Sequence, residues 1–184
     1  ANVDGIPPTG AVALLRQDHQ ILGRRLFASH CSSCHLYNGH DGRGYPVEDS
    51  PSAADLAGFG SVEWITRLLD YDHYVSDKYF GGTKFKDGTM ARKVLAKYTE
   101  EEKALLPDIA LLLADGAKLP YEEPLDEEKR EELLSLYYND DLDFEDGRSC
   151  IECHDIDSED EGSAPDLTGY ASRDWLIEFI GNPE

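Results

Sequence analysis

The chain has 184 residues, of which 38 are acidic and 17 basic, and its formal net charge is −21 at pH 7. Such a field repels nucleic acid and anionic lipid headgroups and attracts basic partners, although acidity can also serve solubility alone. No apolar run reaches the eighteen or so residues that a membrane-spanning helix needs. The length suits one ordinary domain or two small ones, and the composition excludes a nucleic-acid-binding protein.

The N-terminal segment, residues 1–10, is rich in glycine and proline and predicts an extended lead-in. It has no charged stretch followed by an apolar one, so we expect any export signal or anchor to lie outside this sequence. Leu22, Leu26 and Phe27 then recur at helical spacing and predict a helix that runs to Cys31. Gly23 would let another helix approach this one closely.

Two short cysteine motifs dominate the chain: Cys31-Ser32-Ser33-Cys34-His35 and Cys150-Ile151-Glu152-Cys153-His154. Two residues between cysteines put both sulfurs on one side of a helical turn, where they can form thioethers to the vinyl groups of a haem. The histidine that follows can then ligate the iron. The motifs therefore predict two covalently bound haem c groups, attached at Cys31, Cys34, Cys150 and Cys153 and ligated by His35 and His154.

Zinc or redox chemistry is the alternative for such motifs. A single copy could be half of a zinc site or a dithiol that happens to precede a histidine. The two copies use all four cysteines and leave no separate Cys or His pair at zinc-finger spacing. The haem interpretation is therefore favoured over two zinc or disulfide elements.

Regular elements follow the first motif. Residues 38–44 are rich in turn formers and predict a loop. Ser61 is a candidate N-cap for a helix over 62–69, with Trp64, Ile65, Leu68 and Leu69 on one apolar face. Thr99 to Glu102 has the pattern of a capping box, Pro107 should kink or restart the helix that follows, and Gly116 should end it.

The second half contains a repeat of the first. Residues 55–64 align without gaps with 166–175, a shift of 111 residues from Trp64 to Trp175, whereas His35 and His154 are 119 apart. Duplication of one haem-binding unit explains both shifts if the first loop has eight extra residues. An acidic helix over 127–138 leads through 139–141 into the second motif, without counterparts of Gly23 and Phe27. We predict an all-α fold with two tandem haem domains, 1–118 (with an N-terminal extension) and 127–184, joined by a linker at 119–126.

The helix before the first motif resembles the N-terminal helix of class I cytochromes c, on the evidence of Gly23, Phe27 and the motif itself. In that class a methionine sulfur from a loop before the last helix ligates the iron opposite the histidine and raises the reduction potential. Met90 is the one methionine of the chain, follows the loop residues 86–89 and precedes Thr99. The resemblance implies Met90 as an iron ligand of the first haem, the alternative being a core-filling side chain.

The second haem has no methionine. By the repeat, a counterpart of Met90 would fall after Glu184, so we expect the second domain to be C-terminally incomplete and to lack its native distal ligand. The unassigned histidines are ordinary surface or hydrogen-bonded residues more often than ligands. They are His19, His30, His40 and His73.

Several segments of the chain together carry a second resemblance. They are Ile6-Pro7-Pro8, Ala13–Arg16, Leu26-Phe27, the first cysteine motif, Asn38–Gly42, Tyr79–Thr83, Lys86–Gly88 and the paired tryptophan segments. Together they resemble one family, the dihaem cytochrome c portion joined to, or partnering, cytochrome b in some bacterial quinol:cytochrome c oxidoreductases. The resemblance implies a periplasmic location or one on the outer face of the inner membrane, an upstream anchor, and a cytochrome b/Rieske complex as partner. In that family a methionine of the second domain follows a segment like 182–184.

The leading function is single-electron transfer between redox proteins with basic docking surfaces, and not enzymatic turnover, because the iron does the chemistry. A dihaem peroxidase-like enzyme is the alternative, and it would need an open iron position and a distal acid-base group. A haem-based sensor is a third reading, without positive support in the sequence.

Overall fold

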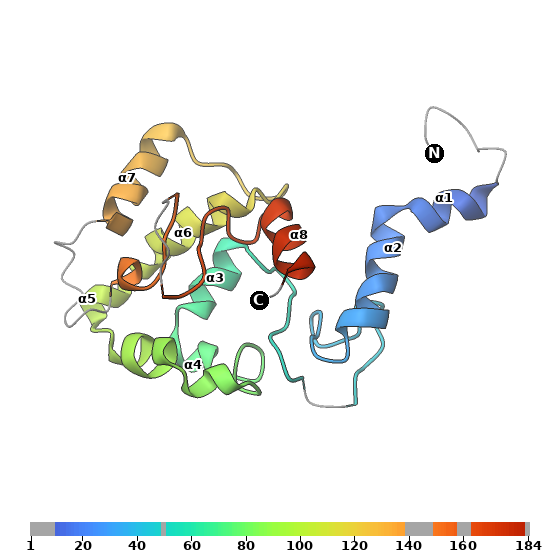
Figure 1. Cartoon of the computed structure of the whole chain (residues 1–184), viewed down its shortest axis with the longest axis horizontal. Coiled ribbons are helices and arrows are strands. Elements are labelled where there is room, and N and C mark those ends of the chain that lie inside the picture. The colour runs from blue at the N-terminus through green and yellow to red at the C-terminus, as the bar shows by residue number, and fades with distance from the viewer. Residues whose placement is uncertain (1–9, 49–50, 139–148, 158–162, 183–184) are drawn as a thin grey trace. The chain divides into compact units, whose positions relative to one another are not determined.

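The computed structural model describes residues 10–48, 51–138, 149–157 and 163–182, and the structural statements below refer to these residues. They are helical and contain no β-strand, with only isolated bridges from His40 to Tyr37 and Pro46 (Figure 1). The predicted all-α class is therefore confirmed, whereas two tandem haem domains remain a prediction. Within the described ranges, no helix is long and apolar enough to cross a membrane.

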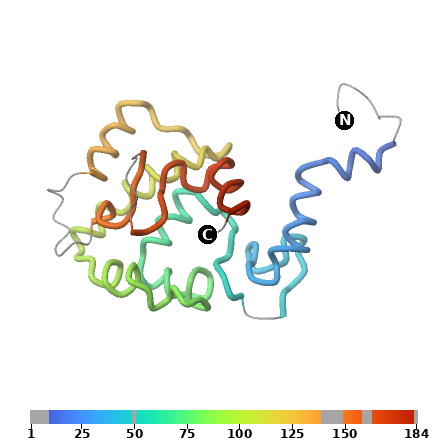
Figure 2. Tube along the Cα trace, viewed as in Figure 1, coloured from blue at the N-terminus to red at the C-terminus, as the bar shows by residue number. Residues whose placement is uncertain are grey.

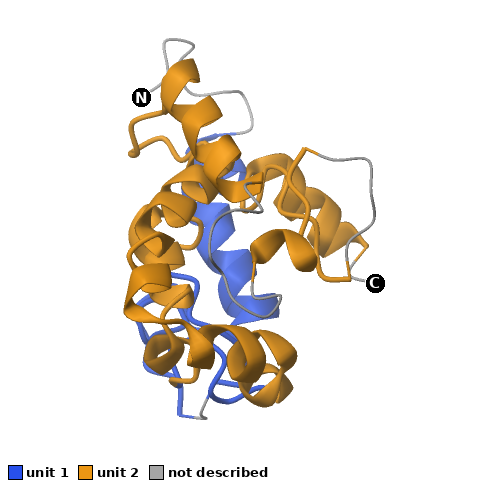
Figure 3. Cartoon of the chain, turned by 90° about the vertical axis from the view of Figure 1, so that its left-hand side faces the viewer, with its two compact units in different colours: residues 1–57, 77–83 blue, residues 58–76, 84–184 orange. Residues whose placement is uncertain are grey.

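The chain divides into two compact units (Figure 3). Unit 1 comprises Ala1–Ala57 and Asp77–Thr83, and unit 2 comprises Gly58–Ser76 and Lys84–Glu184. The predicted haem domains, 1–118 and 127–184, have boundaries that differ from those of the two compact units, and they stay a prediction.

Unit 1 begins with three consecutive helical segments, coloured blue in Figure 2: α1 (Ala11–Gln17), α2 (His19–Leu26) and the π-helical turn η1 (Phe27–Cys31). Asp18 caps α2 by accepting hydrogen bonds from two backbone N–H groups of its first turn. The helix reaches Cys31 as predicted. A Cβ on Gly23 would meet no atom of the described chain within 4 Å, so the close helix crossing expected there is not seen in this structure.

The segment after the first motif is a loop, as predicted. Gly39, Gly42 and Gly44 all have positive φ, which glycine adopts without steric cost. The buried carboxylate of Asp41 accepts hydrogen bonds from the N–H groups of Arg43 (2.9 Å) and Tyr45 (3.0 Å). These bonds satisfy a carboxylate that would otherwise be costly to bury.

Unit 2 contains the remaining helices and a buried core. The helix α3 packs against α6, with Trp64 and Ile65 inward, and the Ser61 hydroxyl caps α3 by accepting from the Trp64 N–H at 3.1 Å, as predicted. The helices are α3 (Val62–Leu68), α4 (Tyr71–Tyr74), η2 (Lys84–Asp87), η3 (Met90–Val94), η4 (Leu95–Lys97), α5 (Glu100–Lys103), α6 (Leu106–Ala117), α7 (Glu127–Tyr138), η5 (Cys150–Glu152) and α8 (Arg173–Gly181).

The helix predicted after Thr99 is two helices. Thr99 and Glu102 form the predicted capping box, and α5 ends after four residues. Pro107 lies in the first turn of α6, where its missing N–H costs no helical hydrogen bond, so the helix restarts there.

The predicted end at Gly116 is wrong. The helix α6 runs to Ala117, and Lys118 takes the left-handed conformation that ends it, with φ of 52°. Gly116 instead allows a close backbone approach, because a Cβ there would lie 3.5 Å from the Cα of Gly169.

The predicted linker, 119–126, is not helical, and hydrogen bonds join it to α6 and to the start of α3. The Leu125 N–H donates to Asp115 at 2.9 Å, and the Glu122 carboxylate accepts from the Val62 N–H at 3.0 Å. The helix α7 has the predicted bounds, 127–138. Three predicted segments lie outside the described residues: 1–9 of the lead-in, 139–141, and 183–184 of the C-terminal segment.

Candidate functional site

The first motif forms a tight backbone turn at the end of η1. The N–H groups of Cys34 and His35 both donate to the Cys31 carbonyl oxygen, at 3.0 and 2.8 Å. The turn keeps the two cysteines and the histidine together within one short segment.

The ring of His35 is oriented by a second backbone segment of unit 1. Its Nδ1 lies 2.7 Å from the Ala54 carbonyl oxygen. A carbonyl oxygen only accepts, so Nδ1 carries the proton and donates, and the lone pair of the neutral imidazole is on Nε2. Histidine ligands of metals are held in this way, because the bond fixes both tautomer and ring orientation.

Residues 53–56 are held against the first motif by two further bonds. The Ala53 N–H donates to the Cys34 carbonyl (3.1 Å), and the Leu56 N–H donates to the Leu36 carbonyl (2.9 Å). The acceptor for His35 is therefore positioned by backbone bonds on both sides of it.

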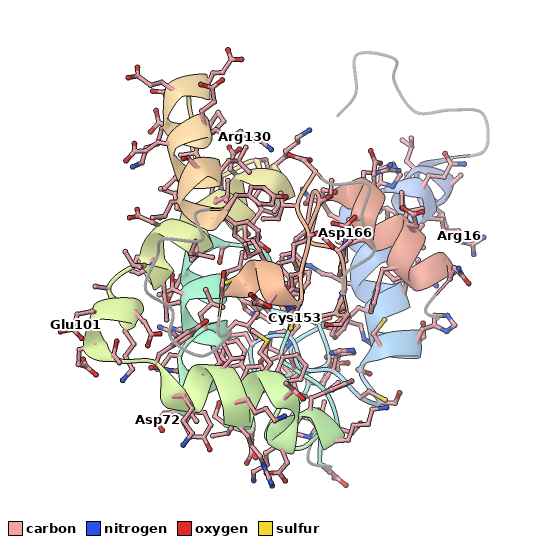
Figure 4. All side chains as sticks on the ribbon, turned by 60° about the vertical axis from the view of Figure 1, so that its left-hand side comes forward. Arg16, Asp72, Glu101, Arg130, Cys153 and Asp166 are labelled. Atoms are coloured by element: carbon pink, nitrogen blue, oxygen red, sulfur yellow. The ribbon has the colours of Figure 1, made fainter. Side chains whose placement is uncertain are left out.

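The second motif repeats this arrangement in unit 2. The N–H groups of Cys153 and His154 donate to the Cys150 carbonyl at 3.2 and 2.8 Å. The Nδ1 of His154 lies 2.7 Å from the Pro165 carbonyl oxygen, so its Nε2 is again the nitrogen that can bind a metal. Figure 4 labels Cys153 and Asp166, the residues next to the two partners of this bond.

The loop that supplies this acceptor is fixed as in the first copy. The Ala164 N–H donates to the Cys153 carbonyl (3.0 Å), and the Leu167 N–H donates to the Asp155 carbonyl (2.8 Å). Each bond is the counterpart of one in the first copy, with the two shifts of 119 and 111 residues that the sequence predicted. Both motifs therefore share one hydrogen-bonding scheme.

The backbone conformation repeats as well. Asn38 and its counterpart Asp157 have positive φ of 53° and 54°. Gly60 and its counterpart Ala171 also have positive φ, 82° and 62°. Conformations that side chains rarely adopt recur at equivalent positions, which supports duplication of one unit.

The repeated aromatic residues meet in unit 2. The rings of Phe59 and its counterpart Tyr170 lie 5.6 Å apart between centroids. Each also contacts the tryptophan of its own copy, Phe59 with Trp64 at 4.8 Å and Tyr170 with Trp175 at 5.0 Å. The segments that follow the two histidine acceptors thus pack on each other through equivalent side chains.

No disulfide joins any two of the four cysteines. Hydrogen bonds to the side chains of Ser52 and Ser33 lower the pKa of Cys34. Burial raises the pKa of Cys150 to about 11. Each motif thus presents two sulfurs and one imidazole nitrogen, which fits the donor set for covalent haem attachment.

Met90 begins η3 and is half-buried, and it precedes the capping box at Thr99 as the sequence predicted. It belongs to unit 2, whereas His35 belongs to unit 1. Its role as an iron ligand of the first haem therefore stays a prediction.

The unassigned histidines have ordinary surroundings. His19 and His30 are exposed, His40 accepts from the Gly42 N–H at 3.0 Å, and His73 pairs with Asp70 at 2.8 Å. Among the residues that the structure describes, no three His, Cys, Asp or Glu side chains gather as a metal-binding group.

Sequence reasoning missed two residues of α7 that hold the second motif. The Tyr137 hydroxyl donates to the His154 carbonyl at 3.0 Å, and burial raises the pKa of this phenol, which keeps it protonated. Arg130, labelled in Figure 4, pairs with Asp157 at 2.9 Å and with Asp115 at 3.5 Å. The sequence signal for them was the presence of a tyrosine and an arginine on a helix that also carries four glutamates.

Comparison with family models, with curated proteins and with solved structures finds no match to this chain.

Proposed function

We propose that this chain is a dihaem c-type cytochrome that transfers single electrons and is not itself an enzyme. The observation that carries the proposal is the paired histidine geometry. At both motifs Nδ1 donates to a loop carbonyl at 2.7 Å, and Nε2 is left as the metal-binding nitrogen. A structural zinc site needs four ligands, whereas each motif supplies three, two cysteines and one histidine.

In this proposal one haem is held by Cys31, Cys34 and His35 and the other by Cys150, Cys153 and His154. Met90 is the proposed second iron ligand of the first haem. When bound, each haem supplies a one-electron iron centre whose potential depends on its axial ligands and surroundings.

The chain's own residues hold and orient the ligands. The loop carbonyls of Ala54 and Pro165 keep each imidazole in one tautomer, and the Tyr137 hydroxyl holds the backbone at His154. The hydrogen bond from Nδ1 to a backbone carbonyl also influences the reduction potential of the haem, because a stronger hydrogen bond makes Nε2 a more basic iron ligand.

The proposed setting is the periplasm or the outer face of a bacterial inner membrane, with a cytochrome b/Rieske complex as a partner. This rests on the sequence resemblance. The net charge of −21 supports docking to proteins with basic surfaces, since opposite charge accelerates encounter.

Electron-transfer kinetics test the proposal. The holoprotein is reduced anaerobically and mixed with a small basic cytochrome c in a stopped-flow instrument at increasing salt. We expect reversible one-electron oxidation of each haem, and a rate that falls steeply with salt, since the Debye length shrinks to about 8 Å at physiological ionic strength.

Two results would contradict the proposal. Sustained turnover of hydrogen peroxide, faster than electron exchange with the partner, would favour the peroxidase-like alternative. A rate that does not change with salt would remove the docking role of the acidic surface and leave solubility as its explanation.

A further inference from the structure

Two adjacent tyrosines of α7 hold the backbone that follows the second motif. The Tyr137 hydroxyl donates to the carbonyl oxygen of His154 at 3.0 Å. The Tyr138 hydroxyl accepts from the N–H of Ile156 at 3.2 Å and donates to the carbonyl oxygen of the same residue. These bonds join the end of α7 to residues 154–156, and one of them reaches the histidine that is the proposed iron ligand.

The helix α7 is itself fixed to the core of unit 2. It packs against α6 (Figure 1), and its residues Leu133 and Tyr137 are only 1% and 2% exposed. Arg130 of α7 pairs with Asp115 of α6 at 3.5 Å and with Asp157, just after the second motif, at 2.9 Å. The two phenols therefore connect the second motif to a packed helix.

The residues at the equivalent positions of the first copy have other roles. By the shift of 119 that relates the two motifs, Tyr137 and Tyr138 correspond to Asp18 and His19. Asp18 caps α2 with its carboxylate, and His19 is exposed. Neither is a phenol, so these tyrosine hydroxyls belong to the second motif, whereas a carbonyl acceptor for the histidine Nδ1 is common to both motifs.

The bond from Nδ1 of His154 to the Pro165 carbonyl depends on the placement of two backbone segments. Two backbone hydrogen bonds join the loop around Pro165 to residues 153–155. Loss of the Tyr137 hydroxyl would release the His154 carbonyl from α7, and a hydrogen bond weakens steeply as its angle leaves the optimum. A weaker bond at Nδ1 makes Nε2 a less basic ligand, which disfavours ferric iron and raises the reduction potential.

We propose that Tyr137, supported by Tyr138, is a positioning residue for the second haem alone: by holding the backbone of His154 it strengthens the bond from Nδ1 to Pro165 and lowers the reduction potential of that haem. The two repeated motifs then differ in potential partly through a helix that has no counterpart of these phenols in the first copy. This inference rests on the proposed function, because it requires a haem at His154.

The test is Tyr137→Phe in the haem-loaded chain, which removes the hydroxyl and keeps the ring. Both potentials are measured by spectroelectrochemical titration, and the change is repeated in the Cys31→Ala/Cys34→Ala variant, where the second haem is expected alone. We expect the potential of the second haem to rise by about three-fold or more in its redox equilibrium constant, or about 28 mV for one electron. Tyr138→Phe should raise the same potential by less, because its bonds lie two residues beyond the ligand.

The matched control is Tyr45→Phe, the same change at a side chain of unit 1 that is 65% exposed, which should leave both potentials unchanged. Tyr137→Phe in the Cys150→Ala/Cys153→Ala variant should leave the potential of the first haem unchanged. A two-haem Tyr137→Phe chain with unaltered potentials would overturn the proposal, even if its free energy of unfolding fell, because the tyrosine would then be structural only. Equal shifts at both haems would also overturn it. A wild-type chain without covalent haem would instead refute the proposed function.

Discussion

Gly60 lies against its counterpart in the repeat, Ala171, and its replacement by alanine is the sharpest structural test. Gly60 has φ of 82°, and a Cβ there would lie 2.6 Å from the Cβ of Ala171 and 3.3 Å from that of Ala117. The left-handed conformation costs an alanine about 1–2 kcal/mol. Relief of the overlap should cost about 1–3 kcal/mol more. We expect Gly60→Ala to lower the free energy of unfolding by about 2–4 kcal/mol.

A control and a double mutant separate the two causes. Gly39 has φ of 80° with no atom within 4 Å of a Cβ, so Gly39→Ala should cost only the conformational part, about 1–2 kcal/mol. Adding Ala171→Gly to Gly60→Ala removes the closest overlap. The double mutant should therefore lose about 1–2 kcal/mol less than the sum of the single changes.

Urea unfolding followed by far-UV circular dichroism gives these free energies. Strict additivity of Gly60→Ala and Ala171→Gly would refute the reasoning, because it would mean that the two residues do not touch. Equal costs at Gly60 and Gly39 would have the same meaning.

Three further changes test separate parts of the account. Met90→Ala should abolish the absorption band of a thioether–iron bond and lower the potential of one haem in a redox titration, and survival of both would remove Met90 as a ligand. Ser61→Ala should cost about 1 kcal/mol in urea unfolding, through loss of the cap on α3, whereas an unchanged midpoint would show that the cap contributes nothing. Burial alone would raise the pKa of Asp41, but hydrogen bonds from the N–H groups of Arg43 and Tyr45 outweigh it and lower this pKa. The ionised carboxylate therefore stabilises the fold at pH values above the usual pKa of an aspartate, and this stabilisation is lost as the pH falls. The stability difference between the wild type and Asp41→Asn, measured by thermal melts, should therefore shrink between about pH 5 and pH 3, and a difference that grows would contradict the sign.

Features set by neighbours in sequence could be predicted. The cap at Ser61, the capping box at Thr99 and the restart at Pro107 all depend on a few adjacent residues, and the structure has them where the sequence placed them. The repeat could also be predicted, because duplication left equivalent residues at two fixed shifts, 119 at the motifs and 111 after the loop. The structure has equivalent hydrogen bonds in the two copies.

Features set by tertiary packing could not be predicted. Gly116 was expected to end a helix, but its use is the close approach of Gly169, which no local pattern encodes. The bond from Tyr137 to the His154 carbonyl joins residues 17 apart across a segment with no periodic signal. Residues 77–83 belong with unit 1, where the Lys78 carbonyl accepts from the Asp55 N–H, and this pairing also leaves no local trace.

The central claim is that each cysteine motif attaches one haem, and intact-protein mass spectrometry tests it directly. The chain is produced in a bacterial periplasm with the machinery for covalent haem attachment, alongside Cys31→Ala/Cys34→Ala and Cys150→Ala/Cys153→Ala variants. The account predicts the mass of two covalently bound haems on the wild type and one on each variant. A wild-type chain without covalent haem, or with zinc bound at the motifs, would contradict it.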